Sequence, residues 1–204
     1  MEKTIKLGSD NMKYKTLKTD IIMLAIMSFI GFCVEDIWMI FRHGYLDNRN
    51  MYLPCLLGYG LFIIVLYYII GTPNNLFNKI ELKRTKGTII YFFICFILVS
   101  IGELLLGLFV EKTGGFSYWD YSTLPLHITK YTSIPTSVGF ALVITLFMGY
   151  VFIPLRNKLN KLVDKMPLFI VILILVALII DFIISFKTMY TNNGKNLLWM
   201  IKFR

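Results

Sequence analysis

Apolar residues gather in five runs along the chain, and polar or basic stretches separate these runs. The runs cover residues 21–41, 53–71, 88–110, 134–154 and 167–186. Each has about 20 residues, which is enough for a helix to cross a hydrocarbon core of about 30 Å. We therefore predict an all-α fold, a polytopic integral membrane helical bundle with about five transmembrane helices.

The runs also set the expected domain organisation. Residues 1–20 are predicted to form a basic cytoplasmic tail, residues 21–186 a five-helix transmembrane domain, and residues 187–204 a short basic C-terminal tail. The sequence Gly71-Thr72-Pro73 is expected to end the second helix, because proline cannot continue the backbone hydrogen-bond ladder. The last residues, NLLWMIKFR, are too short to span a bilayer and are expected to lie at its interface.

Lysine and arginine indicate the orientation. They are concentrated in residues 1–20, in the loop after the second run and in the loop after the fourth run. The positive-inside rule places these segments in the cytoplasm. We therefore predict a multi-pass protein of the cell membrane with a cytoplasmic N-terminus and an outer C-terminus.

Composition narrows the class of protein. Hydrophobic residues make up 57% of the 204 residues, more than in a typical soluble domain. The net charge of +9 comes from basic residues beside apolar runs, where they meet anionic lipid, so nucleic acid is not an expected partner. The cysteines, Cys33, Cys55 and Cys95, form no CxxC pair, and with only His43 and His127 we predict neither a metal site nor a cofactor.

Three acidic residues interrupt the apolar runs. With the predicted orientation, Glu35, Glu103 and Asp181 all fall in the outer half of the membrane. An ionised carboxylate in hydrocarbon costs about 2.5 to 3.5 kcal/mol on insertion scales, and intramembrane acids usually have a function. We therefore expect Glu35 and Glu103 to share a polar pocket, with Tyr59 at the same depth and Arg49 folding over it from the loop.

A structural interpretation of the acids stays open. Glu35 and Glu103 could each pin two helices together through a hydrogen bond, for example to Tyr59 or Ser100. Asp181 lies near the predicted end of its helix, and we expect its carboxylate to reach out to the interface.

The loop sequence SYWDYS supports two interpretations. Tyr118, Trp119 and Tyr121 are typical of the aromatic belt at the headgroup layer. That explanation does not cover Asp120, which suggests instead a lid held by Arg49 or Arg42. Both interpretations remain open.

Five short motifs occur in a specific order: a Glu in the first helix, an NR pair, a PxxxxYG segment, the sequence GELLLG and the sequence YWDYS. In this order they resemble the small bacterial membrane family called putative ABC transporter type IV permease, or CmpB-like. The residues that match its pattern are Glu35, Asn48, Arg49, Pro54, Tyr59, Gly60, Glu103, Gly107, Trp119, Asp120, Tyr121 and Ser122. The chain departs from it at Asn50, where the family has glycine, and after YWDYS, around His127 and Lys130.

The resemblance implies transport. We therefore predict a small membrane transport component, a permease-like subunit with an outward-side polar pocket. Because the chain has no GxxxxGK[ST] motif, a separate ATPase or other membrane-protein subunit is an expected partner besides the lipid bilayer. The alternative is a non-catalytic regulatory or scaffolding protein that binds another membrane protein.

A membrane-embedded hydrolase is the least favoured reading. The sequence EDIWMIFR is similar to the EExxxR motif of intramembrane CAAX-type proteases, but its spacing is two residues too long and the histidine motifs are missing. We therefore predict that the protein is not an enzyme.

Overall fold

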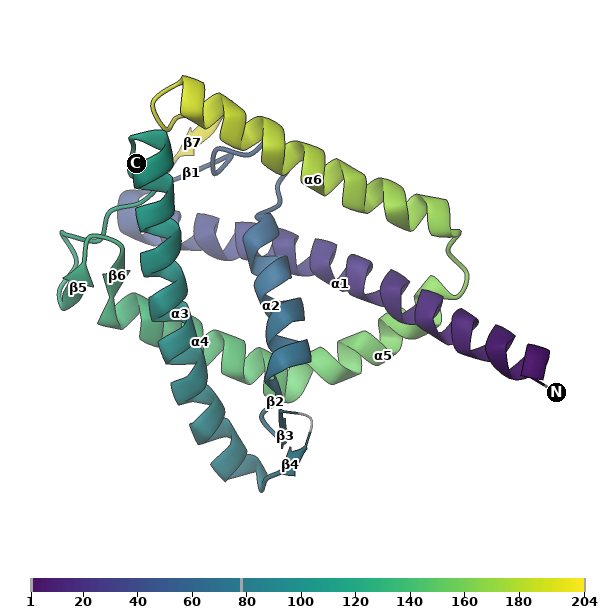
Figure 1. Ribbon diagram of the computed structural model, residues 1–204. Helices are drawn as coiled ribbons and strands as arrows, with labels where there is room; N and C mark the ends of the chain where they lie inside the picture. Colours follow the sequence, from purple (N-terminus) through teal and green to yellow (C-terminus); the bar gives the residue numbers. More distant parts are fainter. Residues whose placement is uncertain (1, 78, 204) are drawn as a thin grey trace. The chain divides into compact units, whose positions relative to one another are not determined.

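The computed structural model describes residues 2–77 and 79–203, with side chains from residue 14 onward, and most of it is helical (Figure 1). The helices are α1 (Glu2–His43), α2 (Leu57–Ile69), α3 (Arg84–Gly114), α4 (Ile134–Leu146), the π-helical turn η1 (Phe147–Val151), α5 (Phe152–Val163) and α6 (Leu168–Thr191). The strands are β1 (Tyr45–Asp47), β2 (Gly71–Thr72), β3 (Asn75–Leu76), β4 (Ile80–Glu81), β5 (His127–Thr129), β6 (Thr132–Ser133) and β7 (Met200–Lys202).

Within these described residues, 4 helical segments are long and apolar enough to cross a membrane, which confirms the predicted all-α membrane fold. They are Tyr14–His43, Arg84–Gly114, Ile134–Val163 and Leu168–Thr191. The helices are longer than the apolar runs because hydropathy marks only the part that can lie in hydrocarbon, whereas the backbone ladder continues into polar sequence. Thus α1 already begins at Glu2, inside the predicted tail, and α6 continues to Thr191.

Helix α2 is shorter than the run that predicts it. The run covers residues 53–71, but the 13-residue helix begins only at Leu57. Pro54 accounts for the non-helical Leu53, because proline disfavours the helical conformation at the residue before it, and the Leu56 N–H donates to the Ser28 carbonyl of α1. At about 1.5 Å per residue, α2 spans only about 20 Å, so it cannot cross a bilayer alone.

Contacts divide the chain into two compact units, and each is described by itself. Unit 1 comprises residues 2–66, 154–189 and 195–203, and unit 2 comprises residues 67–153 and 190–194.

In unit 1, helices α1 and α6 run in the same direction (Figure 1). Near the start of α6, the Lys18 Nζ of α1 donates to the Met166 carbonyl at 2.8 Å. At the other end, strand β1, which follows α1, pairs antiparallel with β7, which follows α6. The start of α2 lies beside the middle of α1, since the Leu56 N–H donates to the Ser28 carbonyl at 2.9 Å.

Helix α5 gives the polar part of α1 a partner. Arg156, Leu159 and Val163 recur at helical spacing and are buried on one face of α5. The Arg156 guanidinium pairs with Asp20, and the Thr19 hydroxyl donates to Asn160 Oδ1 at 2.6 Å. These polar contacts therefore stabilise the part of α1 that precedes its apolar run.

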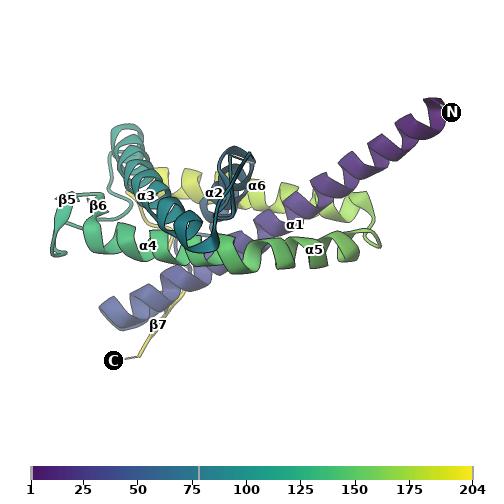
Figure 2. The same ribbon diagram turned by 90° about the horizontal axis from the view of Figure 1, so that it is seen from below.

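In unit 2, helices α3 and α4 pack against each other (Figure 2), and η1 directly continues α4. The buried core includes Tyr91, Cys95 and Val99, one helical turn apart on α3, and Ala141 of α4. A small sheet, β2–β3–β4, links α2 to α3, and the hairpin β5–β6 leads into α4.

Candidate functional site

A tight turn after strand β1 carries Arg49. The Met51 N–H donates to the Asn48 carbonyl at 2.8 Å, and φ is +47° at Arg49 and +60° at Asn50. Two successive positive φ angles are the signature of a type I′ turn. Asparagine adopts positive φ more readily than most residues, so Asn50 fits where the resembled pattern has glycine. Arg49 has no such preference, and its backbone carries a strain of about 1–3 kcal/mol.

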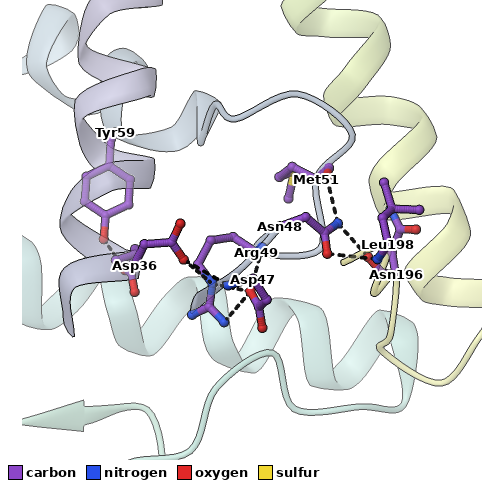
Figure 3. Close-up of polar contacts among 9 residues, drawn as sticks. Asp36, Asp47, Asn48, Arg49, Met51, Tyr59, Asn196 and Leu198 are labelled. Carbon is purple, nitrogen blue, oxygen red and sulfur yellow. Dashed lines mark hydrogen bonds and ion pairs between the residues drawn. The ribbon is translucent and has the colours of Figure 1, made fainter. Parts of the chain in front are cut away.

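The side chain of Arg49 joins two buried carboxylates (Figure 3). Its Nη2 lies 2.7 Å from Asp47 Oδ1, and its Nε lies 3.7 Å from Asp36 Oδ1. The Asp47 N–H also donates to Asp36 Oδ1, at 3.4 Å. Burial alone lowers the pKa of Arg49, but the charge and hydrogen bond of Asp47, with the nearby acids of α1, raise that pKa above its ordinary value. The guanidinium therefore stays charged and holds both carboxylates.

The flanking asparagines, Asn48 and Asn50, tie this turn to the C-terminal segment, and Figure 3 shows the contacts of Asn48. The Asn48 Nδ2 donates to the carbonyls of Met51 and Asn196, each at 2.8 Å, and its Oδ1 accepts the Leu198 N–H at 3.0 Å. The Asn50 Oδ1 accepts the Asn196 N–H at 3.0 Å, and the Asn50 carbonyl accepts the Asn196 side chain at 2.9 Å. The turn is therefore fixed on both sides of Arg49.

Glu35, which neighbours Asp36 on α1, has a hydrogen-bond partner outside the ion pairs of Arg49. The Tyr59 hydroxyl of α2 donates to Glu35 Oε1. Gly31, one turn before Glu35, allows this contact, because a Cβ there would lie 2.4 Å from the Tyr59 ring. Glu35 and Asp36 differ by about 100° around the helix, which is why neighbouring acids serve two different partners.

Asp181 has a structural partner that the sequence did not indicate. Its Oδ1 accepts the N–H groups of Tyr52 and Leu53, at 3.0 and 2.8 Å, and the Ser185 hydroxyl at 3.4 Å. Only 6% of Asp181 is exposed, so the expectation that it reaches out to the interface is wrong. The carboxylate instead satisfies backbone donors of the irregular segment before α2, which have no helical acceptor.

In unit 2, Glu103 lies between a loop and a helix. Its Oε1 accepts the Tyr121 hydroxyl at 3.5 Å, and its Oε2 accepts the Ser137 hydroxyl at 3.2 Å. Tyr121 belongs to the YWDYS loop and Ser137 to the first turns of α4, where Ser133 caps the helix by accepting the Thr136 N–H. The arrangement offers a carboxylate between two hydroxyls that can each donate or accept a proton.

The rest of the YWDYS loop packs around Tyr131. The Trp119 Nε1 donates to the Tyr131 carbonyl at 2.9 Å. The Tyr131 ring lies against Gly107 of α3, where a Cβ would be 2.3 Å from Cγ of the ring. Gly107 is therefore the position that lets this loop approach α3.

Asp120 faces outward and shapes its own loop. It is exposed, and its Oδ1 accepts the Ser122 N–H at 2.8 Å. The hydroxyl and the backbone N–H of Ser122 hold the pKa of Asp120 below its ordinary value. Nearby, Lys130 pairs with Glu111 at 2.7 Å, and this contact raises the pKa of Lys130.

A comparison with protein families gives a match to the family described as "Putative ABC-transporter type IV" over residues 22–186, which is most of the chain. The chain belongs to this family. Comparisons with curated proteins and with solved structures give no match. The description of this family indicates that the chain is an ABC-transporter-related membrane component.

The type IV motif residues have identifiable local environments. Gly31 and Gly107 each face a tyrosine ring, and Gly60 lies against the Leu24 carbonyl, 2.2 Å from where its Cβ would be. Pro54 delays the start of α2. Asn48 and Ser122 each fix a loop backbone through hydrogen bonds.

The structure brings some predicted site residues together. Glu35 meets Tyr59, and Glu103 meets Tyr121, whereas Arg49 pairs with Asp36 and Asp47. Trp119 and Asp120 form hydrogen bonds within their own loop. Glu35, Arg49 and Tyr59 belong to unit 1, whereas Glu103, Trp119, Asp120 and Tyr121 belong to unit 2. A single pocket shared by all of them stays a prediction.

Sequence reasoning missed two participants in these contacts. Asp47 stands two residues before Arg49. Asn50, where the resembled pattern has Gly, indicates positive φ and therefore a tight turn. Together these two features could have indicated the ion pair. No signal pointed to Asn196, because its contacts are long-range and use mostly its own backbone groups. Among the described residues, no group of three or more His, Cys, Asp and Glu could hold a metal ion.

Proposed function

We propose that this chain is a small transport component of the cell membrane, a permease-like subunit that works with a separate ATPase. Membership of the type IV family supports this role, and the sequence has no nucleotide-binding GxxxxGK[ST] motif of its own. Energy would therefore come from a partner subunit.

The observation that carries the proposal is the pair of carboxylates inside apolar helices. Glu35 on α1 and Glu103 on α3 each accept a hydrogen bond from a tyrosine hydroxyl of another element. Acidic residues within membrane spans are costly and usually mark a path for ions, protons or polar substrates. We assign Glu35 and Glu103 to an outward-side polar pocket that takes a cation, a proton or a polar headgroup.

The proposed topology has five crossings, with the N-terminus in the cytoplasm. Helices α1 and α6 run in the same direction. If both span the membrane, the chain must return to the first side between them, so it crosses the membrane an odd number of times between α1 and α6. Helix α3 and the segment Ile134–Val163 supply two of these crossings. We assign the third crossing to α2 together with the irregular segment 51–56 that precedes it. The basic loops then lie inside.

Co-purification from native membranes tests the partner. The tagged chain is extracted in mild detergent, and co-purifying proteins and ATP hydrolysis are measured. We expect a stoichiometric ATPase whose turnover falls at least tenfold with Glu103→Gln or Glu35→Gln. Glu81→Gln, at an exposed position in β4, is the matched control and leaves turnover unchanged. Turnover that survives both substitutions excludes these acids from the mechanism.

A regulatory or scaffolding role is the second candidate, and one observation favours it. Asp36, Asp47 and Asp181 are all held by the protein's own groups, as expected of acids that stabilise a fold. Recovery of another membrane protein at stoichiometric amount, without an ATPase, supports this role instead of transport.

A further inference from the structure

The C-terminal residues 195–203, which we call the strap, lie across the end of unit 1. Strand β7 of the strap pairs with β1, and the Phe203 N–H donates to the Gly44 carbonyl at 2.8 Å. Asn48 and Asn50 hold its other end through Asn196 and Leu198. Most of these bonds use the strap's backbone, so they fix its place without using its side chains.

The strap lies where a membrane-spanning unit meets the bilayer surface. Strand β1 begins two residues after α1 ends at His43, and the strap follows α6, which ends at Thr191. Both helices are candidate spans, and they run parallel, so these two ends lie on the same side of the membrane. We therefore place this ribbon of two strands in the headgroup layer, where the apolar side chains of interfacial segments enter about 5–10 Å into the boundary with the acyl chains.

The side chains of the strap have the composition that this layer favours. Its exposed apolar residues range from 37% exposed for Met200 to 55% for Phe203; they are Leu197, Leu198, Trp199, Met200, Ile201 and Phe203. Lys195 and Lys202 are exposed beside them. Trp and Phe enter the boundary between headgroups and chains, whereas lysines on the same segment attract anionic lipid. A soluble surface would gain nothing from six uncovered apolar residues in one nine-residue segment.

We propose that the strap is a binding surface for anionic lipid headgroups. Its apolar side chains enter the boundary layer, and Lys195 and Lys202 contact the lipid phosphates. The backbone bonds to Asn48 and Asn50 connect this surface to the Arg49 turn. Loss of the lipid contact therefore loosens the turn that holds Asp36 and Asp47.

Quenching of Trp199 fluorescence tests the binding surface in the full-length protein. The chain is reconstituted in phosphatidylcholine bilayers with and without phosphatidylglycerol, and the lipids carry bromine either near the headgroup or deep in the chain. Subtracting the signal of Trp199→Phe isolates Trp199 from Trp38 and Trp119. We expect the shallow bromine to quench Trp199 most, and phosphatidylglycerol to strengthen this quenching.

Charge variants test the lysines. Lys195→Gln with Lys202→Gln is expected to weaken the response to phosphatidylglycerol about tenfold or more, since each basic residue near the surface contributes to binding. The control, Lys158→Gln with Lys161→Gln, removes the same charge from exposed positions of α5 and leaves the Trp199 signal unchanged. Hydrogen exchange at the Met51 N–H is expected to rise in the strap variant only.

Two results overturn the proposal. If aqueous iodide quenches Trp199 equally in bilayers with and without phosphatidylglycerol, Trp199 lies in water. Trp199 that is shielded from both iodide and brominated lipid is covered by protein, which makes the strap a protein-docking segment instead.

Discussion

The two polar clusters of this chain are built from the same kind of residue but are held in different ways. In unit 1, Asp36 and Asp47 face a guanidinium at distances down to 2.7 Å, on a turn whose backbone is fixed from both sides. In unit 2, Glu103 accepts longer bonds, of 3.2 and 3.5 Å, from two hydroxyls. The contact between Arg49 and Asp47 has the short distance of a strong charge-assisted bond, about 2.7–2.9 Å, whereas the contacts of Glu103 are longer than that.

The difference separates a rigid part from an adaptable one. The Arg49 turn has positive φ at two residues and ion pairs that break only at high cost, so we expect it to keep its geometry. Glu103 can exchange a hydroxyl for a ligand or a proton with less loss, because its contacts of 3.2 and 3.5 Å are longer than a strong O–H···O hydrogen bond of about 2.5–3.0 Å. We therefore expect unit 1 to hold the fold around α1 and Glu103 to respond to substrate.

The largest expected effect comes from Arg49→Met. Removing the guanidinium leaves Asp36 and Asp47 buried with no counter-charge from that side chain, and breaking a buried ion pair costs about 3–5 kcal/mol. The free energy of unfolding in detergent measures the loss. Adding Asp47→Asn to Arg49→Met is expected to restore part of it. Equal stability of the wild type and Arg49→Met contradicts the rigid role of this cluster.

Asp181→Ala is expected to have the next largest effect. It leaves the N–H groups of Tyr52 and Leu53 without this acceptor, at a cost of about 1–3 kcal/mol for each unsatisfied group. Hydrogen exchange at these two amides, compared between Asp181→Ala and Asp181→Asn, measures the change. Asparagine keeps an acceptor oxygen, so the Asn variant should exchange more slowly than Ala; the reverse order removes Asp181 from its role.

Gly107→Ala sharpens the comparison from the side of unit 2. The new methyl group would lie 2.3 Å from the Tyr131 ring, and overpacking of this kind costs about 1–3 kcal/mol. Gly102→Ala on the same helix meets nothing within 4 Å, so it should be neutral or stabilising. Thermal unfolding measures both. If the two variants melt together, the YWDYS loop does not pack on α3 as described.

Asn50 gives the smallest expected effect. Asn50→Gly keeps the positive φ but loses the bond to the Asn196 N–H, so the stability should change by less than about 1 kcal/mol. Asn50→Ala should cost more than Asn50→Gly, because alanine disfavours positive φ. Melting temperatures of the two variants give the order, and an alanine variant as stable as the glycine variant argues against the type I′ turn.

Much of the fold followed from hydropathy, since five apolar runs predicted five helices and four of them are long enough to span. The residues at which the helices begin and end did not follow from hydropathy. Polar contacts such as Arg156 with Asp20 extend helices beyond the apolar runs, and Pro54 shortens α2. These effects depend on neighbours distant in sequence or on local backbone sterics that a hydropathy average does not contain.

The candidate site was predictable only in its short-range geometry. The spacing of Gly31 and Glu35 allowed a contact with Tyr59, and the adjacency of Glu35 and Asp36 required two directions. Arg49 was expected over Glu35, yet it pairs with Asp47, because two residues in a tight turn meet more easily than residues of different elements. The partners of Asp181 were hidden, since backbone N–H groups of an irregular segment leave no mark in a sequence.

The most direct measurement pairs stability with activity in one variant. Glu103→Gln is compared with the wild type by thermal unfolding and by the ATP turnover of the complex purified with its ATPase. The account predicts an unfolding free energy within about 1 kcal/mol of the wild type and at least a tenfold loss of turnover. A variant that unfolds much more easily, or that keeps its turnover, contradicts the assignment of Glu103 as the responsive carboxylate.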